Sequence, residues 1–98
     1  MRIEGKSVVI TGAAGGIGAA IAEAFVQEGA KGIVIADLDE EKVMATSDIL
    51  GIKGFQCDVV QESQIKELVA FAESLYGPID IFISNAGIFC LGGDETDD

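Results

Sequence analysis

The residues best suited to chemistry in this sequence are the glycines of the segment TGAAGGIG, which runs from Thr11 to Gly18. These glycines are Gly12, Gly15, Gly16 and Gly18. Glycine adopts the positive-φ conformations that a sharp turn between a strand and a helix needs, and it lets a phosphate approach backbone N–H groups closely. A helix starting near Ile17 would offer unpaired N–H donors and the positive end of its dipole. The segment therefore predicts a pyrophosphate-binding turn.

The glycine pattern has a plainer alternative, because any tight connection between a strand and a helix favours glycine. Its spacing departs from GxGxxG, and no Lys followed by Ser or Thr comes after Gly18, which excludes a Walker-type phosphate loop. The sequence contains no histidine, so the commonest metal ligand and acid/base catalyst is missing. We therefore expect no metal site in this chain.

The elements that must position the turn follow from apolar runs of strand length that alternate with stretches of helical period. We expect strands at residues 7–11, 33–37, 55–59 and 79–84. The first helix places apolar residues on one face, at Ile17, Ile21, Ala24 and Phe25, and Gly29 ends it. Asp39 is expected to cap the second helix. The third helix carries a stripe of Ile65, Leu68, Val69, Ala72 and Leu75 and ends at Gly77 and Pro78.

Four strands joined by three crossover helices predict an α/β fold, a doubly wound parallel sheet in three αβα layers with strand order 3-2-1-4. Residues 1–98 form one expected domain, which ends in an acidic tail at residues 94–98. Ligands of such sheets bind outside the carboxyl ends of the strands, where the strand order reverses. Binding residues are therefore expected after Thr11 and after Ser84.

Two motifs on the two sides of that position give the sequence a family resemblance. TGxxxGxG at Thr11–Gly18 and NAG at 85–87 together resemble the paired signature of short-chain dehydrogenases/reductases. The resemblance covers essentially the whole chain and implies a Rossmann-type domain that binds NAD. In the family pattern, Gly12, Gly16 and Gly18 shape the phosphate turn, and the backbone of Ile17 lies near the pyrophosphate.

The same resemblance assigns Asp37, with its neighbour Leu38, to the adenosine ribose. Asp37 lies 19 residues beyond Gly18, at the end of the second expected strand, where an acid accepts hydrogen bonds from ribose hydroxyls. A 2′-phosphate would bring about −1.5 to −2 charges against this carboxylate. No Lys or Arg occupies the glycine turn or positions 36–38, so the sequence predicts NAD as cofactor. The plainer alternative is that Asp37 caps the following helix, although Asp39 already fills that role.

Resemblance to the family further implies contacts with adenine and a second wall for the crevice. Asp58 would bond the adenine amino group and the backbone of Val59 an adjacent ring nitrogen, although Asp58 could also be a simple turn residue. The second wall would consist of Asn85, Ala86 and Gly87.

The family's catalytic Ser and its YxxxK pair are not found in these 98 residues, and Tyr76 is followed four positions later by Asp80. We therefore expect the cofactor-binding portion of an NAD-dependent oxidoreductase, acting on an alcohol or carbonyl substrate and homo-oligomeric when complete, in a fragment that is itself inactive. The alternatives are a stand-alone nucleotide-binding module and an inactive truncated product. A sheet truncated after its fourth strand would expose an apolar edge from Ile79 to Leu91.

Composition limits the remaining partners. Seventeen acidic against six basic residues give a net charge of −11, which repels nucleic acids and anionic membrane surfaces. No apolar run approaches the length of a membrane span, and the first residues lack the apolar stretch of a signal peptide, so we expect a cytoplasmic location. Cys57 and Cys90 lie in apolar segments, which favours reduced, buried thiols over a disulfide.

Overall fold

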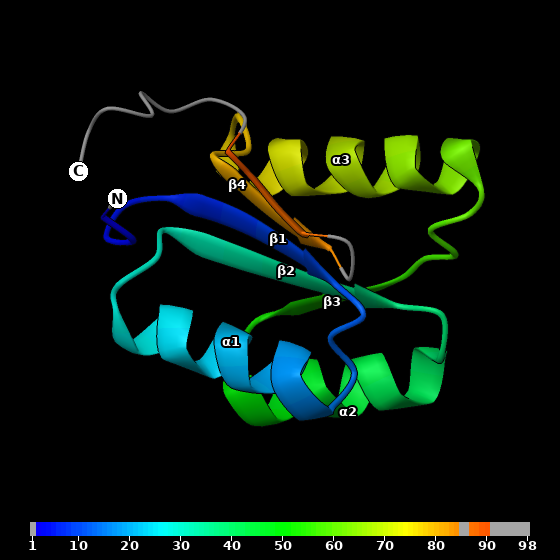
Figure 1. Ribbon diagram of the computed structural model, residues 1–98, viewed down its shortest axis with the longest axis horizontal. Coiled ribbons are helices and arrows are strands. Elements are labelled where there is room, and N and C mark those ends of the chain that lie inside the picture. The colour runs from blue at the N-terminus through cyan, green and yellow to red at the C-terminus, as the bar shows by residue number, and fades with distance from the viewer. Residues whose placement is uncertain (1, 85–86, 91–98) are drawn as a thin grey trace.

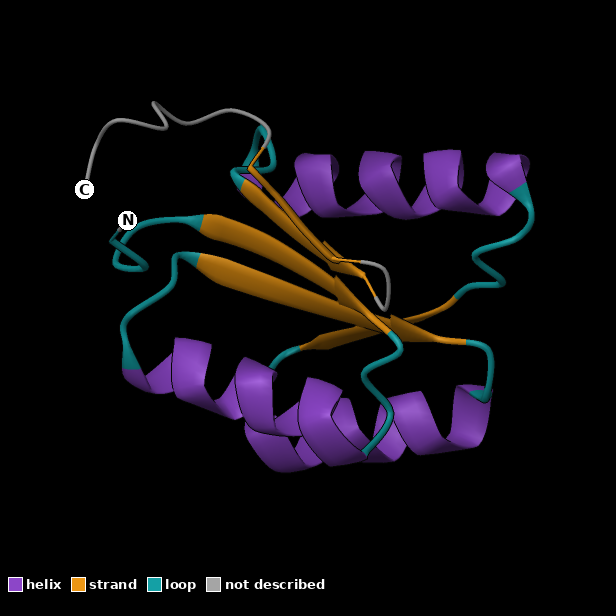
Figure 2. Ribbon diagram, in the orientation of Figure 1, coloured by secondary structure: helices purple, strands orange, loops and turns teal. Residues whose placement is uncertain are grey.

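The computed structural model describes residues 2–84 and 87–90 and shows a twisted sheet with helices on both faces (Figure 1). In chain order the elements are β1 (Ser7–Thr11), α1 (Gly16–Gln27), β2 (Gly32–Asp37), α2 (Glu40–Leu50), β3 (Lys53–Gln56), α3 (Glu62–Tyr76), β4 (Ile81–Ser84) and β5 (Gly87–Cys90). Figure 2 shows the three layers, with α1 and α2 on one face and α3 on the other. The predicted alternation of strands and helices is confirmed.

The strand order is β3-β2-β1-β4-β5, and the first four of these strands are parallel. Ile10, near the end of β1, pairs with Ile35 of β2 on one side and with Ile83 of β4 on the other. The carboxyl ends of β1 and β4 therefore lie side by side. After β1 the chain continues to β2 on one side of this pair, and after β4 it continues to β5 on the other side. This is the predicted doubly wound arrangement, with the reversal of strand order where it was expected.

β5 is an element that the sequence analysis did not predict. It runs antiparallel to β4, with Ser84 opposite Gly87 and Ile81 opposite Cys90. The expectation that β4 forms an unpaired edge is therefore wrong, because the chain folds back and pairs with that edge. The short run GIFC carries no turn signal or alternation of its own, so its pairing depends on the neighbouring strand.

The core consists of two clusters, one on each face of the sheet. Val8 and Ile10 point toward α1 and α2, whereas Val9 points toward α3, because successive residues of a strand face opposite sides. All five residues of β1 are buried, as expected for a central parallel strand covered on both faces. The sheet therefore holds the ends of β1 and β4 rigidly between two packed layers.

Several details of the predicted elements are corrected by the structure. The third strand ends at Gln56, and residues 57–59 continue as a loop rather than a strand. In α1 the buried residue is Ala22, whereas Ala24 is exposed and Ile17 is 80% exposed. Ile17 lies in the first turn, at the margin of a surface cavity, so helical spacing alone misjudged which residues are covered.

Candidate functional site

The glycine turn between β1 and α1 has two distinct requirements for glycine. Gly12 and Gly16 have φ angles of 68° and 61°, which side chains rarely adopt. A Cβ on Gly18 would lie 2.6 Å from the Gly12 carbonyl oxygen and 2.7 Å from the Ala13 Cα. Gly12 and Gly16 therefore permit the turn, and Gly18 permits α1 to pack closely against it.

The first turn of α1 offers backbone donors to open space. The helix begins at Gly16, and among the described residues no side chain caps it at Gly15. The first N–H groups of a helix have no partner within the helix, and they lie at its positive end. A Cβ built on Gly15 or Gly16 would meet nothing within 4 Å. An anionic group can therefore approach these donors without obstruction.

Three hydrogen bonds tie the turn to the neighbouring elements. Ala13 N–H donates to the Ala36 carbonyl of β2 at 3.2 Å, and Ala14 N–H donates to Asp37 Oδ2 at 3.1 Å. The Thr46 hydroxyl of α2 donates to the Ala14 carbonyl at 3.0 Å. Thr46 was missed by the sequence analysis, because nothing in its local sequence indicates a contact across the fold.

Asp37, the last residue of β2, faces both the glycine turn and the start of α2. Its second carboxylate oxygen, Oδ1, accepts a hydrogen bond from Asp39 N–H at 3.2 Å. Asp39 itself caps α2 by accepting from Lys42 N–H at 3.1 Å, as predicted. Each carboxylate oxygen has two lone pairs, so Asp37 can accept further hydrogen bonds from a ligand while it keeps both of these.

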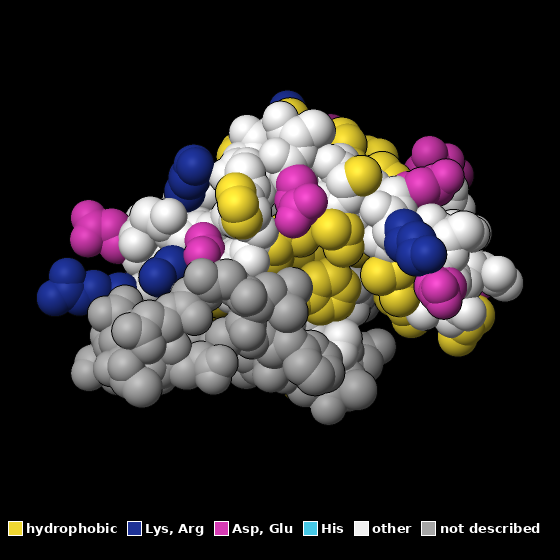
Figure 3. Space-filling model, turned by 90° about the horizontal axis from the view of Figure 1, so that it is seen from above, with side chains coloured by type: hydrophobic (Ala, Val, Ile, Leu, Met, Phe, Trp, Pro, Cys, Tyr) yellow, Lys and Arg dark blue, Asp and Glu magenta, His cyan; other side chains and the backbone are white. Residues whose placement is uncertain are grey.

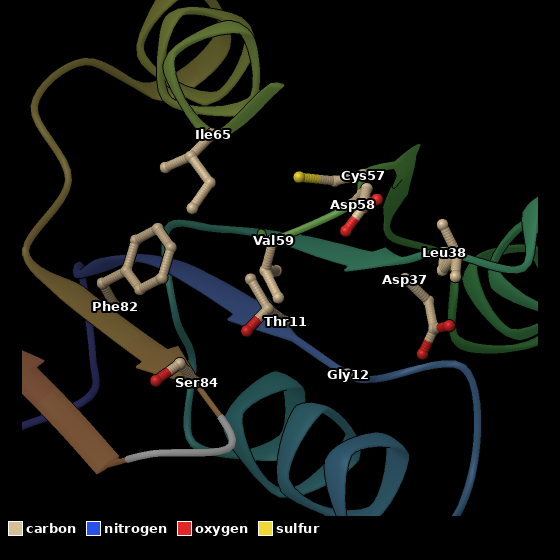
Figure 4. A pocket seen from close by; sticks show the side chains of 10 residues that line it. All are labelled: Thr11, Gly12, Asp37, Leu38, Cys57, Asp58, Val59, Ile65, Phe82 and Ser84. Atoms are coloured by element: carbon tan, nitrogen blue, oxygen red, sulfur yellow. The ribbon is translucent and has the colours of Figure 1, made fainter. Parts of the chain in front are cut away.

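A cavity of about 560 Å³ lies beside the ends of the parallel strands (Figure 4). Its lining consists of Thr11, Gly12, Asp37, Leu38, Cys57, Asp58, Val59, Ile65, Phe82 and Ser84. In Figure 4, Ile65 and Phe82 point into one side of the cavity, and the Asp37 carboxylate lies on the other, near Gly12. Figure 3 shows a face of the molecule on which hydrophobic side chains gather in a hollow with acidic side chains nearby. The cavity thus combines an apolar side with an acidic side.

Asp58 is held in the loop after β3 by three hydrogen bonds, one of which its carbonyl accepts from Gln61 N–H at 3.0 Å. Its N–H donates to Gln64 Oε1 of α3 at 2.8 Å, and its carboxylate Oδ1 accepts from Val60 N–H at 3.1 Å. The adjacent Gln61 is the N-cap of α3 but makes no side-chain capping bond. The carboxylate of Asp58 therefore has a structural partner as well as a position on the cavity wall. Gln64 is a second contributor that the sequence analysis missed.

Cys57 forms part of the apolar side of the cavity. It is a free cysteine with 1% of its surface exposed, which confirms the predicted buried thiol. Burial raises the pKa of its thiol, and the negative charges of Asp58 and Glu67 raise the pKa further. The thiol is therefore neutral at physiological pH. The side chain of Cys90 lies outside the described residues.

A second cavity of about 380 Å³ lies between the ends of β1 and β4 and the start of α1. It shares Thr11, Gly12 and Ser84 with the first cavity. The Thr11 hydroxyl donates to the Ile83 carbonyl at 3.4 Å and so joins β1 to β4 between the two cavities. The two cavities meet at the position where the strand order reverses. Together they can take an elongated ligand that passes over the ends of these strands.

The residues predicted to bind a cofactor are only partly brought together. Those lining one or both cavities are Gly12, Gly15, Ile17, Gly18, Asp37, Leu38, Asp58 and Val59. Gly16 lies between them in the turn. Asn85 and Ala86 lie outside the described residues, and Gly87 begins β5.

Metal clusters and membrane-spanning helices are both absent from the part of the chain that the structure describes. There, no group of three or more His, Cys, Asp or Glu side chains is placed to hold a metal ion. None of the described helices has the length and apolar character needed to cross a membrane.

Comparison with known proteins adds to this geometry. A family model described as short chain dehydrogenase matches residues 6–97. The chain belongs to the short-chain dehydrogenase family. It is 45% identical over 87 residues to a mitochondrial borneol dehydrogenase from Lavandula x intermedia, and 39% identical over 90 residues to (+)-cis,cis-nepetalactol synthase from Nepeta racemosa. These matches cover 89% of this chain and 33% of each relative, so the chain spans about a third of their length.

Solved structures of short-chain dehydrogenases share the fold. A short-chain dehydrogenase/reductase from Burkholderia phymatum, solved in complex with NAD, superposes with a TM-score of 0.80 at 32% identity. That match covers 84% of this chain and 31% of the other chain. A short-chain dehydrogenase from Mycobacterium smegmatis gives a TM-score of 0.81 at 33% identity, covering 94% and 40%. The predicted Rossmann-type fold and family are therefore confirmed.

Proposed function

We propose that this chain binds NAD across its two cavities and forms the cofactor-binding part of an oxidoreductase of this family. The position of the Asp37 carboxylate carries the proposal, because it lies on the cavity wall and is joined to the glycine turn through Ala14 N–H. An acid at the end of the second strand can accept hydrogen bonds from the ribose hydroxyls of an adenosine. The Burkholderia phymatum relative was solved in complex with NAD, which supports NAD as the cofactor.

The residues of the cavities fit each part of a dinucleotide. The apolar side formed by Ile65, Cys57 and Phe82 suits the faces of an adenine ring, and Asp58 can accept a hydrogen bond from its amino group. Asp37 suits the adjacent ribose. The open N–H groups of the first turn of α1 suit the pyrophosphate, since a helix N-terminus favours anions.

The charge of the site favours NAD over NADP. Among the described residues, neither cavity is lined by any Lys or Arg. A 2′-phosphate on the adenosine ribose would bring about −1.5 to −2 charges against the Asp37 carboxylate. With no basic side chain to compensate, the phosphate would be repelled and poorly bonded.

Hydride transfer to or from a bound nicotinamide ring is the chemistry that the cofactor supplies. The residues of this chain bind and orient the cofactor. The one tyrosine of the sequence, Tyr76, packs its ring over Gly32 at the amino end of β2, where an added Cβ would lie 2.3 Å from the ring. Tyr76 is therefore at the end of the strands opposite to the cavities and cannot exchange a proton with a substrate there. We propose that an enzyme carrying this domain acts on an alcohol or carbonyl compound and is a homo-oligomer.

A nucleotide titration tests the proposed function. NAD and ADP-ribose should bind the 98-residue chain at least about tenfold more tightly than NADP, measured by calorimetry. Equal or tighter binding of NADP would contradict the assignment of Asp37.

The position of Tyr76 also favours a second candidate, a stand-alone module that binds the nucleotide without chemistry. In that case the chain binds NAD but forms no NADH with any alcohol, because among the described residues neither cavity is lined by a tyrosine or lysine to take up the hydroxyl proton. Formation of NADH by the 98-residue chain, followed by its absorbance, would exclude this candidate.

A further inference from the structure

We propose that Thr46 is a positioning residue for phosphate binding, because its hydroxyl holds the peptide that aims the Gly15 N–H at the cofactor space. The inference rests on the proposed function and adds to it a residue on α2, outside the cavity linings. The observation behind it is the 3.0 Å hydrogen bond from Thr46 Oγ1 to the Ala14 carbonyl, between residues 32 positions apart in the sequence.

The geometry of a peptide unit connects this bond to the phosphate donors. The Ala14 carbonyl and the Gly15 N–H belong to one planar trans unit, so they point in opposite directions. When Thr46 of α2 holds the carbonyl, the Gly15 N–H must point away from α2. Open space lies beyond Gly15, which also lines the smaller cavity beside the start of α1. Thr46 thus determines which way the first donor of the turn faces.

This turn needs such an anchor because its glycines allow several backbone conformations. Gly15 and Gly16 follow the held carbonyl, and glycine adopts positive and negative φ about equally well. The Ala14 N–H is already used by Asp37, so it anchors the turn from the other side. Without the Thr46 bond, the Ala14–Gly15 peptide could rotate and withdraw its N–H from a phosphate.

The role of Thr46 differs from that of its neighbour. Ser47 donates its hydroxyl hydrogen bond to the Met44 carbonyl within α2 at 2.9 Å, which is the usual local bond of such side chains in helices. Thr46 instead donates across the fold. The start of α2 is itself joined to Asp37, through Asp39 N–H and Asp37 Oδ1. The ribose-binding acid, α2 and the phosphate turn therefore form one connected unit.

The test removes the Thr46 hydroxyl and compares a ligand with phosphates to one without. Thr46→Val keeps the shape of the side chain and should weaken ADP binding about three- to tenfold, as expected for one lost hydrogen bond. The loss arises because fewer molecules hold the binding-competent turn before the ligand arrives. Adenosine, which has no phosphate, should weaken less than about twofold.

Two controls separate positioning from general damage. Thr46→Ser retains a hydroxyl and should restore ADP affinity. Ser47→Ala removes a hydroxyl that bonds within α2 and should leave the ratio of ADP to adenosine affinity unchanged. Amide hydrogen exchange without ligand adds an independent measurement, in which Thr46→Val should speed exchange at Ala14 N–H.

Unchanged ADP affinity in Thr46→Val, or equal losses for ADP and adenosine, would overturn the role of Thr46. If the unsubstituted chain binds neither ligand, the proposed function fails, and with it the role of Thr46 in binding. The exchange measurement then decides separately whether Thr46 holds the turn, since unchanged exchange at Ala14 would overturn that part too.

Discussion

The two sides of the candidate site present different chemical groups to a ligand, backbone groups on one side and side chains on the other. On the side of α1, the candidate phosphate site consists of backbone N–H groups around Gly15 and Gly16, where no side chain caps the helix and an added Cβ would meet nothing within 4 Å. On the side of β3 and α3, the larger cavity is lined by side chains, with carboxylates at Asp37 and Asp58 and apolar groups at Ile65 and Phe82. The first side can recognise only an anion, whereas the second can distinguish one nucleotide from another.

The comparison indicates where affinity and selectivity reside. A backbone site is altered only by changing the path of the chain, so substitutions there should affect folding and binding together. A side-chain site can lose one contact while the fold persists. Asp37 is the residue that belongs to both sides, because its carboxylate bonds the turn and also faces the larger cavity.

The largest effect is expected from Gly18→Val. A Cβ at this position would lie 2.6 Å from a backbone oxygen of the turn, which cannot move without displacing α1. We expect the free energy of unfolding to fall by about 1 to 3 kcal/mol and nucleotide binding to become undetectable. Urea unfolding and calorimetry measure the two effects.

The matched control is Gly15→Ala, since Gly15 has an extended φ of 172° and open space around its Cβ position. Its free energy of unfolding should stay within about 0.5 kcal/mol of the unsubstituted chain. If both variants unfold alike, the close approach of α1 to the turn does not stabilise the fold.

The next effect concerns selectivity at Asp37. Asp37→Ala removes charge-assisted hydrogen bonds worth about 1.5 to 3 kcal/mol, so NAD affinity should fall about tenfold to a hundredfold. The preference for NAD over NADP should narrow at the same time, because the carboxylate no longer repels a 2′-phosphate. Calorimetric titration with both nucleotides measures each change.

Asp37→Asn separates the two roles of this residue. The amide keeps one oxygen as acceptor but loses the charge, so Ala14 N–H can remain bonded while the repulsion disappears. An Asn variant that keeps the full preference for NAD would show that charge does not set the selectivity.

A smaller effect is expected from Asp58→Ala, which tests the adenine part of the larger cavity alone. Loss of one hydrogen bond to this partly exposed carboxylate should weaken AMP binding about three- to tenfold. Nicotinamide mononucleotide, which has no adenine, should bind as before. Gln64→Ala is the control and should weaken AMP binding less, since Gln64 accepts a hydrogen bond from the Asp58 backbone and does not line the cavity. Equal weakening of both mononucleotides would assign Asp58 to the fold instead.

Much of this architecture could be predicted because it depends on local signals. β1 was located to the residue from its unbroken apolar run, and Asp39 was identified as the cap of α2 from its side chain and the acids that follow. The order of the parallel strands followed from the rule for crossovers. These features depend on neighbours in sequence or on general geometry.

The remaining features depend on contacts between distant segments. The pairing of β5 with β4, the bond of Thr46 to Ala14 and the bond of Gln64 to Asp58 leave no pattern in the sequence. The position of Ile17 was misjudged for the same reason, since helical spacing shows which residues share a face but not how far the partner layer extends. Asp37 was predicted from the sequence to bind the ribose, yet its hydrogen bond to the turn appears only in three dimensions.

The smallest effect is expected on the apolar side of the larger cavity, at Cys57. Burial first, and then the charges of Asp58 and Glu67, raise its pKa above the ordinary value of 9.0. The folded chain therefore favours the neutral thiol, and this contribution to stability is fully present below pH 9.0. Above that pH the unfolded chain gains by ionising its thiol while the folded chain does not. Stability is then lost as the pH rises toward the folded pKa.

Cys57→Ala removes this dependence, so its free energy of unfolding should decrease less between neutral and alkaline pH than that of the unsubstituted chain. Urea unfolding of Cys57→Ala and of the unsubstituted chain, at neutral and at alkaline pH, measures this difference. The lysines and Tyr76 are present in both proteins, so their contributions cancel. Parallel decreases would mean that the thiol ionises as easily in the folded chain as in the unfolded one, and that this side of the cavity is open to water.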